Sequence, residues 1–103
     1  MILVGKDIMS AFIRRHTQSR SPLAAWEKLV SAGYYADFNQ LRKTFPSADY
    51  VHHQYTIFNV GGNKYRLVAE IHYEAQVIKV WRVWTHAEYS LPKNQQVLKR
   101  GLL

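Results

Sequence analysis

Four residues in the second half of the chain carry side chains suited to cleaving RNA without a metal ion. When a 2′-hydroxyl attacks the adjacent phosphate, the reaction needs a base, an acid for the leaving oxygen, and cations for the charge that builds on the phosphate. Arg66 and Lys64 could supply the cations, and His86 could move the proton because imidazole titrates near neutral pH. Tyr89 could orient the substrate or donate a proton. The products would be a cyclic phosphate and a 5′-hydroxyl.

A predicted antiparallel meander holds these residues. The trio Gly61-Gly62-Asn63 is the strongest turn signal in the chain, because glycine and asparagine tolerate the positive φ that hairpin turns require. Strand-forming residues flank it over 55–60 and 64–73, and a second break at 74–76 leads into a third strand over 77–85. The sequence therefore predicts a three-stranded meander, with positive φ at one residue or more of the trio.

Alternation along these strands separates an apolar face from a charged face. The apolar face is predicted to contain Tyr65, Leu67, Ala69, Ile71, Tyr73, Ile78, Val80 and Trp84. The opposite face is predicted to contain Lys64, Arg66, Val68, Glu70, His72, Val77, Lys79, Trp81, Val83 and Thr85. A charged face of this kind is often simply solvated, but here cations are interleaved with an aromatic ring.

Three residues of the last strand are candidates for binding RNA. Lys79 could bind backbone phosphate, and Trp81 could stack a base. Arg82 is a further candidate cation, although strict alternation directs its side chain to the apolar face.

A helical turn is predicted directly after the last strand. Thr85 and Glu88 have the spacing of a capping box, which places the start of the turn at Thr85. His86 and Tyr89, three residues apart, then share one side of the turn, next to the edge that carries the cations. A lone histidine is commonly structural, whereas a histidine and a tyrosine on one turn beside cations favour proton transfer.

The first half of the chain predicts helices. A short strand over 2–4 precedes an amphipathic helix over about 6–16, and residues 17–21 form a polar loop. The next helix is predicted to open with Ser21 as N-cap and Pro22 at its first position, and to stop at Gly33.

A third, shorter helix is predicted from a cap at Asp37 to Pro46, and residues 47–54 form a linker. The predicted fold class is α+β, with two or three helices packed on one face of a small antiparallel sheet. The other face is left open and basic for RNA.

Length and charge narrow the class of protein. With 103 residues, the chain predicts a single domain spanning 1–103. Fourteen Lys and Arg against seven Asp and Glu give a formal charge of +7, which favours a phosphate backbone or an acidic protein as partner. The absence of cysteine excludes disulfides, thiolate metal sites and cysteine nucleophiles, and fits a reducing cytoplasm. We expect no membrane span and no export.

The histidines do not predict a metal site. The five are scattered, and the adjacent pair His52-His53 would point to opposite sides of an extended chain, which is poor geometry for one ion. We therefore expect no metal and no other cofactor.

Two separated motifs carry a family resemblance. Phe58-Asn59-Val60-Gly61-Gly62-Asn63-x-x-Arg66 and Thr85-His86-x-Glu88-Tyr89 resemble the HigB-type toxins of bacterial toxin–antitoxin modules, within the RelE-like ribonuclease superfamily. The similarity covers most of the chain in length and element order and is most specific over 55–89. The family usually has Asp where this chain has Ser90, and often Arg where it has Trp81. Arg82 and Lys79 are the two nearby cations that could replace that Arg.

The resemblance implies a toxin with metal-independent endoribonuclease activity, an mRNA interferase with Arg66, His86 and Tyr89 as catalytic residues. It also implies cleavage of translated messenger RNA in the A site of the 70S ribosome, inhibition of translation, a cytoplasmic location and neutralisation by a HigA-like helix-turn-helix antitoxin. Two other interpretations stay open on the residues alone. One is a non-catalytic basic module that binds RNA or the ribosome, and the other is an interaction subunit whose basic face meets an acidic partner.

Overall fold

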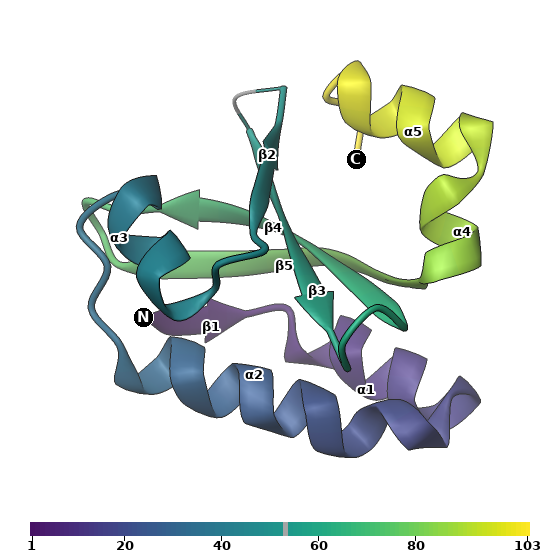
Figure 1. Cartoon of the computed structure of the whole chain (residues 1–103), viewed down its shortest axis with the longest axis horizontal. Helices are drawn as coiled ribbons and strands as arrows, with labels where there is room; N and C mark the ends of the chain where they lie inside the picture. The colour runs from purple at the N-terminus through teal and green to yellow at the C-terminus, as the bar shows by residue number, and fades with distance from the viewer. Residues whose placement is uncertain (53) are drawn as a thin grey trace.

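The chain folds around a five-stranded sheet with helices on both faces (Figure 1), as seen in a computed structural model that describes residues 1–52 and 54–103. The strands are β1 (Ile2–Val4), β2 (Asp49–Val51), β3 (Tyr55–Val60), β4 (Tyr65–His72) and β5 (Val77–Thr85), in the spatial order β1-β5-β4-β3-β2. The predicted α+β class is confirmed. The sheet is mixed, because β1 pairs with β5 in parallel. It is also wider than predicted, since 49–51 is an edge strand rather than part of a linker.

The predicted hairpin between β3 and β4 is present. Val60 pairs with Tyr65 across a four-residue connection. Gly61 has φ 66° and Gly62 has φ 69°, so the expected positive φ is confirmed at both glycines. A Cβ at these positions would be strained whatever space surrounds it, which is the physical reason for two glycines here.

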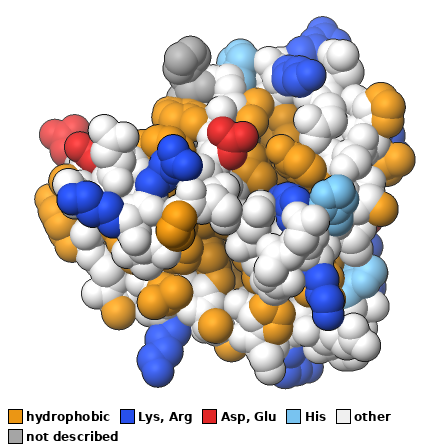
Figure 2. Space-filling view, viewed as in Figure 1, with side chains coloured by type: hydrophobic (Ala, Val, Ile, Leu, Met, Phe, Trp, Pro, Cys, Tyr) orange, Lys and Arg blue, Asp and Glu red, His pale blue; other side chains and the backbone are white. Residues whose placement is uncertain are grey.

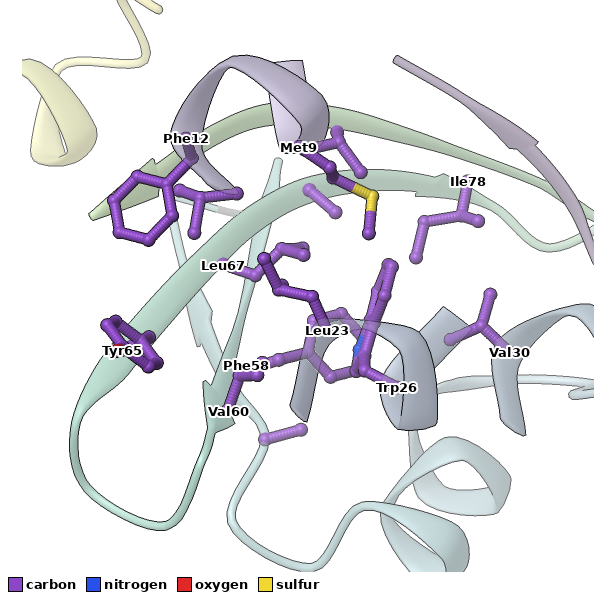
Figure 3. Packing of buried hydrophobic residues seen from close by; sticks show 14 of the residues in the cluster. Met9, Phe12, Leu23, Trp26, Val30, Phe58, Val60, Tyr65, Leu67 and Ile78 are labelled. Atoms are coloured by element: carbon purple, nitrogen blue, oxygen red, sulfur yellow. The ribbon is translucent and has the colours of Figure 1, made fainter. Parts of the chain in front are cut away.

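The main core lies between the sheet and helices α1 (Lys6–Arg15) and α2 (Arg20–Ala32), which both lie beneath the sheet in Figure 1. Aromatic edges meet in this layer. Phe12 contacts Tyr65 with ring centroids 5.6 Å apart, and Trp26 contacts Phe58 at 5.3 Å (Figure 3). Five predicted core residues are buried here, namely Tyr65, Leu67, Ala69, Ile78 and Val80. The helices therefore pack on the face that alternation predicts.

The start of α2 differs from the sequence prediction. A short 3₁₀ turn, η1 (Thr17–Ser19), runs directly into the helix, which begins at Arg20. Ser21 is therefore the second helical residue and not the N-cap, and Pro22 is the third. An N-cap residue precedes the helix, but the chain is already helical at Ser19, so Ser21 cannot take that place. The Ser19 hydroxyl donates to the His16 carbonyl at 2.6 Å. The stop at Gly33 is confirmed.

The third helix, α3 (Phe38–Thr44), begins where the sequence predicts. Asp37 is its N-cap, and the Asp37 carboxylate accepts a hydrogen bond from the Gln40 backbone N–H at 2.9 Å. Of the predicted His52-His53 pair, His53 lies outside the described residues.

The second face of the sheet is not fully open. Helices α4 (His86–Ser90) and α5 (Pro92–Lys99) return across it (Figure 1). A second apolar cluster joins α5 to the sheet and consists of Tyr55, Ile57, Val68, Trp84 and Leu98. The Leu103 backbone N–H donates to the Tyr55 hydroxyl at 2.9 Å and ties down the C-terminal end. The signal for α5 is Pro92, its first residue, because proline favours that position.

A β-bulge changes which residues of β5 face which layer. Val68 pairs with Arg82, whereas Ala69 pairs with Val80, so Trp81 is the extra residue. From this point the alternation inverts. Val83 joins the main core and Trp84 the second cluster, opposite to the prediction. The prediction that Arg82 points to the apolar face is also wrong, because its partner Val68 belongs to the second cluster.

The contact between α5 and the sheet can be tested with Leu98→Ala. Leu98 is fully buried, so its truncation should lower the free energy of unfolding by about 3 kcal/mol. Leu102→Ala is the matched control, because Leu102 is 60% exposed and the loss there should stay below about 0.5 kcal/mol. Denaturant unfolding of both variants checks this. Equal stability of the two would contradict the packing of α5 on the sheet.

Candidate active site

The candidate site lies where the β3–β4 turn meets α4. Tyr65 at the start of β4 pairs with Thr85 at the end of β5, and the His86 backbone N–H donates to the Lys64 carbonyl at 2.9 Å. The turn and the helix are thereby locked together. Figure 2 shows Lys, Arg and His side chains gathered over this part of the molecule, on the right of the view.

Arg66 is buried at the centre of this site. The residue is 8% exposed, whereas an open sheet face would leave it solvated. Nη1 donates to the carbonyls of Asn63 and Tyr65 at 3.3 and 3.1 Å, and Nη2 donates to the Asn63 side-chain oxygen at 2.5 Å. The guanidinium also lies 5.6 Å from the ring centroid of Tyr89. Neither ion pair found among the described residues includes Arg66.

Helix α4 presents His86 and Tyr89 as the sequence predicts. The capping box is complete, because Thr85 Oγ1 accepts from the Glu88 N–H and the Glu88 carboxylate accepts from the Thr85 N–H. His86 is exposed, and Tyr89 is half-buried, with its ring in contact with both Arg66 and Trp84. The structure thus places all three predicted catalytic residues and Lys64 on adjoining segments, with a direct contact between Arg66 and Tyr89.

Two side chains of α5 support α4, and sequence reasoning missed both. Asn94 Nδ2 donates to the Glu88 carbonyl at 2.7 Å, and Gln95 Nε2 donates to the Tyr89 carbonyl at 2.5 Å. These bonds satisfy carbonyls at the end of a five-residue helix that could not hold its shape alone. The amide side chains after Pro92 were the available signal.

Lys79 and Trp81 form a separate group on the same face. Lys79 pairs with Glu70, four residues along β4 from Arg66, or roughly 13 Å at strand spacing. Its ammonium lies 4.1 Å from the centre of the Trp81 ring, and Trp81 Nε1 donates to the Glu70 carboxylate at 3.2 Å. That carboxylate also contacts His72 Nε2 at 2.6 Å. The hydrogen bonds and ring contact of this group join its own members, whereas Trp81 packs against the same second cluster as Tyr89.

Arg82 lies nearer to the site than the alternation pattern predicts. The bulge sets it opposite Val68, two residues from Arg66 along β4, and on the same face. Its side chain is exposed, and Nη1 donates to the Trp81 carbonyl at 2.7 Å. Of the two cations that could replace the family arginine, this position favours Arg82 over Lys79.

The arrangement combines a buried cation with an exposed proton carrier. A guanidinium that lacks a carboxylate partner attracts an anion, and the attraction is stronger where water is excluded. His86 and Tyr89 can exchange or donate a proton at the rim of the same site. Together these groups can bind a phosphate and move protons beside it.

Features elsewhere in the structure lie outside this site. An apolar depression of about 170 Å³ between α2 and the end of β3 is lined by residues including Trp26, Leu29 and Val60, and by none of the candidate site residues. Burial raises the pKa of Tyr73 to about 12, so this phenol stays protonated near neutral pH.

In residues 1–52 and 54–103, no three His, Cys, Asp or Glu side chains gather in a way that could hold a metal ion. None of the helices in that part of the chain is both long enough and apolar enough to cross a membrane.

Comparison with known proteins identifies the family. The family model of the HigB toxin, described as the RelE-like toxic component of a toxin–antitoxin system, matches residues 19–91. The mRNA interferase toxin HigB of Escherichia coli (strain K12) is 33% identical over 92 residues, covering 86% of this chain and 88% of the relative. The mRNA interferase HigB proteins of Escherichia coli O157:H7 and Shigella flexneri are similar to the same extent. Both predicted motifs lie within the matched residues, and the chain belongs to the HigB family of RelE-like toxins from toxin–antitoxin systems.

Proposed function

We propose that residues 1–103 act as one toxin domain, an mRNA interferase that cleaves messenger RNA without a metal ion. The family, the names of the relatives and the composition of the site support this function. The observation that carries it is the buried guanidinium of Arg66, which has no carboxylate partner in the described part of the chain and lies beside Tyr89 and the turn that holds His86.

The proposed reaction is attack of a 2′-hydroxyl on the adjacent phosphate. Arg66 stabilises the charge that develops on the phosphate, and Lys64 adds a second positive charge at the turn. His86 removes the proton of the 2′-hydroxyl. Tyr89 donates a proton to the leaving 5′ oxygen, or orients the phosphate while protonated His86 donates it. The P–O5′ bond breaks as the P–O2′ bond forms, which leaves a cyclic phosphate and a 5′-hydroxyl.

The proposed substrate is translated messenger RNA in the ribosomal A site, in the cytoplasm. Lys79, Trp81 and Arg82 lie along the same face and would extend the contact with the RNA backbone and bases. Membership of a toxin–antitoxin family entails an antitoxin partner. We propose a HigA-like helix-turn-helix protein in that role.

His86→Ala separates an enzyme from a binding module. Removal of the proton carrier should lower cleavage of translated mRNA at least about a hundredfold, while RNA binding stays within twofold because the fixed cations remain. Primer extension in a translation extract measures cleavage, and titration with a 2′-deoxy-substituted RNA measures binding.

His52→Asn is the matched control, because His52 is exposed and has φ 59°, which asparagine tolerates. The control should cleave like the wild type. Full cleavage by His86→Ala would remove His86 from the catalytic residues. A wild-type protein that binds RNA but cuts none would favour the non-catalytic module.

Arg66→Ala should abolish growth arrest and lower cleavage about a hundredfold, the usual loss for an arginine directed at transition-state charge. Arg66→Lys keeps the charge but lacks the planar fork, so it should retain intermediate activity. Growth curves after induction, with expression checked by immunoblot, decide the outcome. Undiminished growth arrest by well-expressed Arg66→Ala would exclude Arg66 from the site.

Arg82→Ala tests the residue that the bulge redirects. RNA binding should weaken, and the magnitude of the slope of log K against log salt should fall by about one, as expected for one lost phosphate contact. Arg14→Ala is the control, since Arg14 is also exposed but lies on α1, beneath the other face. Identical salt slopes for the two variants would show that Arg82 does not contact phosphate.

A further inference from the structure

We propose that Asn63 is a positioning residue, which holds the guanidinium of Arg66 in place while leaving its positive charge available to an anion. Asn63 contributes two of the three acceptors that bind this guanidinium, its own carbonyl and its side-chain oxygen. The inference rests on the proposed function, because the anion in question is the phosphate at the cleavage point.

The hydrogen bonds of Arg66 leave part of the guanidinium unused. Arginine has five N–H donors. Among the described residues, two donors of Nη1 and one of Nη2 have acceptors, so Nε–H and one N–H of Nη2 have none. Among the described residues, the enclosed side-chain N and O atoms without a hydrogen bond are Trp26 Nε1 and the Tyr73 hydroxyl. Arg66 Nε has no acceptor and is not one of these enclosed atoms, so it still reaches solvent. Two donors on one planar group suit bidentate binding of a phosphate.

The chemical type of residue 63 decides whether the charge stays available. An asparagine oxygen accepts a hydrogen bond from Arg66 but carries no charge. An aspartate of the same shape would form an ion pair and neutralise the cation, and in a site with little water the effect would be large. All three acceptors of Arg66 are neutral, and the ring of Tyr89, 5.6 Å from the guanidinium, carries no carboxylate either. The cation is therefore fixed in position without being neutralised.

The turn brings Asn63 to this place. Gly61 and Gly62, both with positive φ, reverse the chain within the four-residue connection. This reversal lets the side chain of Asn63 contact the guanidinium of Arg66, three residues later. On its other side the guanidinium meets Tyr89 from α4. Asn63 thus limits the rotation of a long side chain that would otherwise adopt many rotamers.

Three variants test this role in purified full-length protein. Asn63→Asp should keep or raise the melting temperature, because it adds an ion pair, yet lower mRNA cleavage about a hundredfold and weaken binding of a 2′-deoxy-substituted RNA. Asn63→Ala keeps the charge of the site, so binding of that RNA should stay within twofold. It removes the side-chain acceptor that positions Arg66, so kcat should fall about tenfold. Asn39→Asp, on the exposed surface of α3, is the control for the loss of one net charge and should match the wild type.

A double-mutant cycle shows whether Asn63 acts through Arg66. Adding Asn63→Ala to Arg66→Lys should reduce cleavage by less than a further twofold, whereas independent residues would multiply their effects. Wild-type cleavage by Asn63→Asp, or multiplying losses in the double variant, would overturn the role of Asn63 and leave the proposed function intact. Failure of the wild-type protein to cleave any translated mRNA would instead overturn the proposed function, and the positioning role with it.

Discussion

The site depends on the burial of one cation, Arg66, in strand β4, which is covered on both faces. Residues 65–69 are all buried, with the main core on one face and the second cluster on the other. Among the described residues, the buried polar or charged ones are Ser19, Thr56 and Arg66, so Arg66 alone carries a formal charge. An unpaired ion in such a place is costly, and neutral acceptors recover only part of the lost hydration. Asn63 of the β3–β4 turn supplies two of the neutral acceptors, and the Tyr65 carbonyl supplies the third. Helix α4 adds the ring of Tyr89, 5.6 Å from the guanidinium.

Features set by neighbouring residues could be predicted from the sequence. The Gly61-Gly62 turn depends on the backbone freedom of two glycines, and the Thr85–Glu88 capping box on side chains three residues apart. The Asp37 cap is local in the same way. These features predict the turn before β4 and the helical turn that carries His86 and Tyr89, whereas Lys64, predicted as the first residue of the strand, lies in the β3–β4 turn. The burial of Arg66 could not be predicted, because it depends on α4 and on the second cluster.

The β-bulge could not be predicted from alternation. Val83 and Trp84 are both apolar, so the pattern reads equally well in either register, and only the pairing with β4 decides between them. The extra residue at Trp81 inverts every later side chain of β5 and moves Arg82 to the face of Arg66. The position of α5 could not be predicted for a related reason, since its contact with the sheet joins Leu98 to Tyr55, more than forty residues earlier.

The contact between Lys79 and Trp81 bears on how RNA could lie along this face. The ammonium occupies one side of the indole, 4.1 Å from its centre, so a base can stack there only if Lys79 moves. A cation–π contact at a partly exposed site is worth about 0.5–1 kcal/mol, whereas stacking of a base on an aromatic side chain is worth about 1–3 kcal/mol. The exchange therefore favours the base, and the displaced ammonium becomes available to a backbone phosphate, where it gains a counterion-release contribution. In the free protein the Glu70 carboxylate accepts a hydrogen bond from the indole N–H at 3.2 Å, which orients the ring. On this balance the pairing of Lys79 with Trp81 in the free protein is compatible with both proposed RNA contacts, because the ammonium that leaves the ring becomes available to a phosphate.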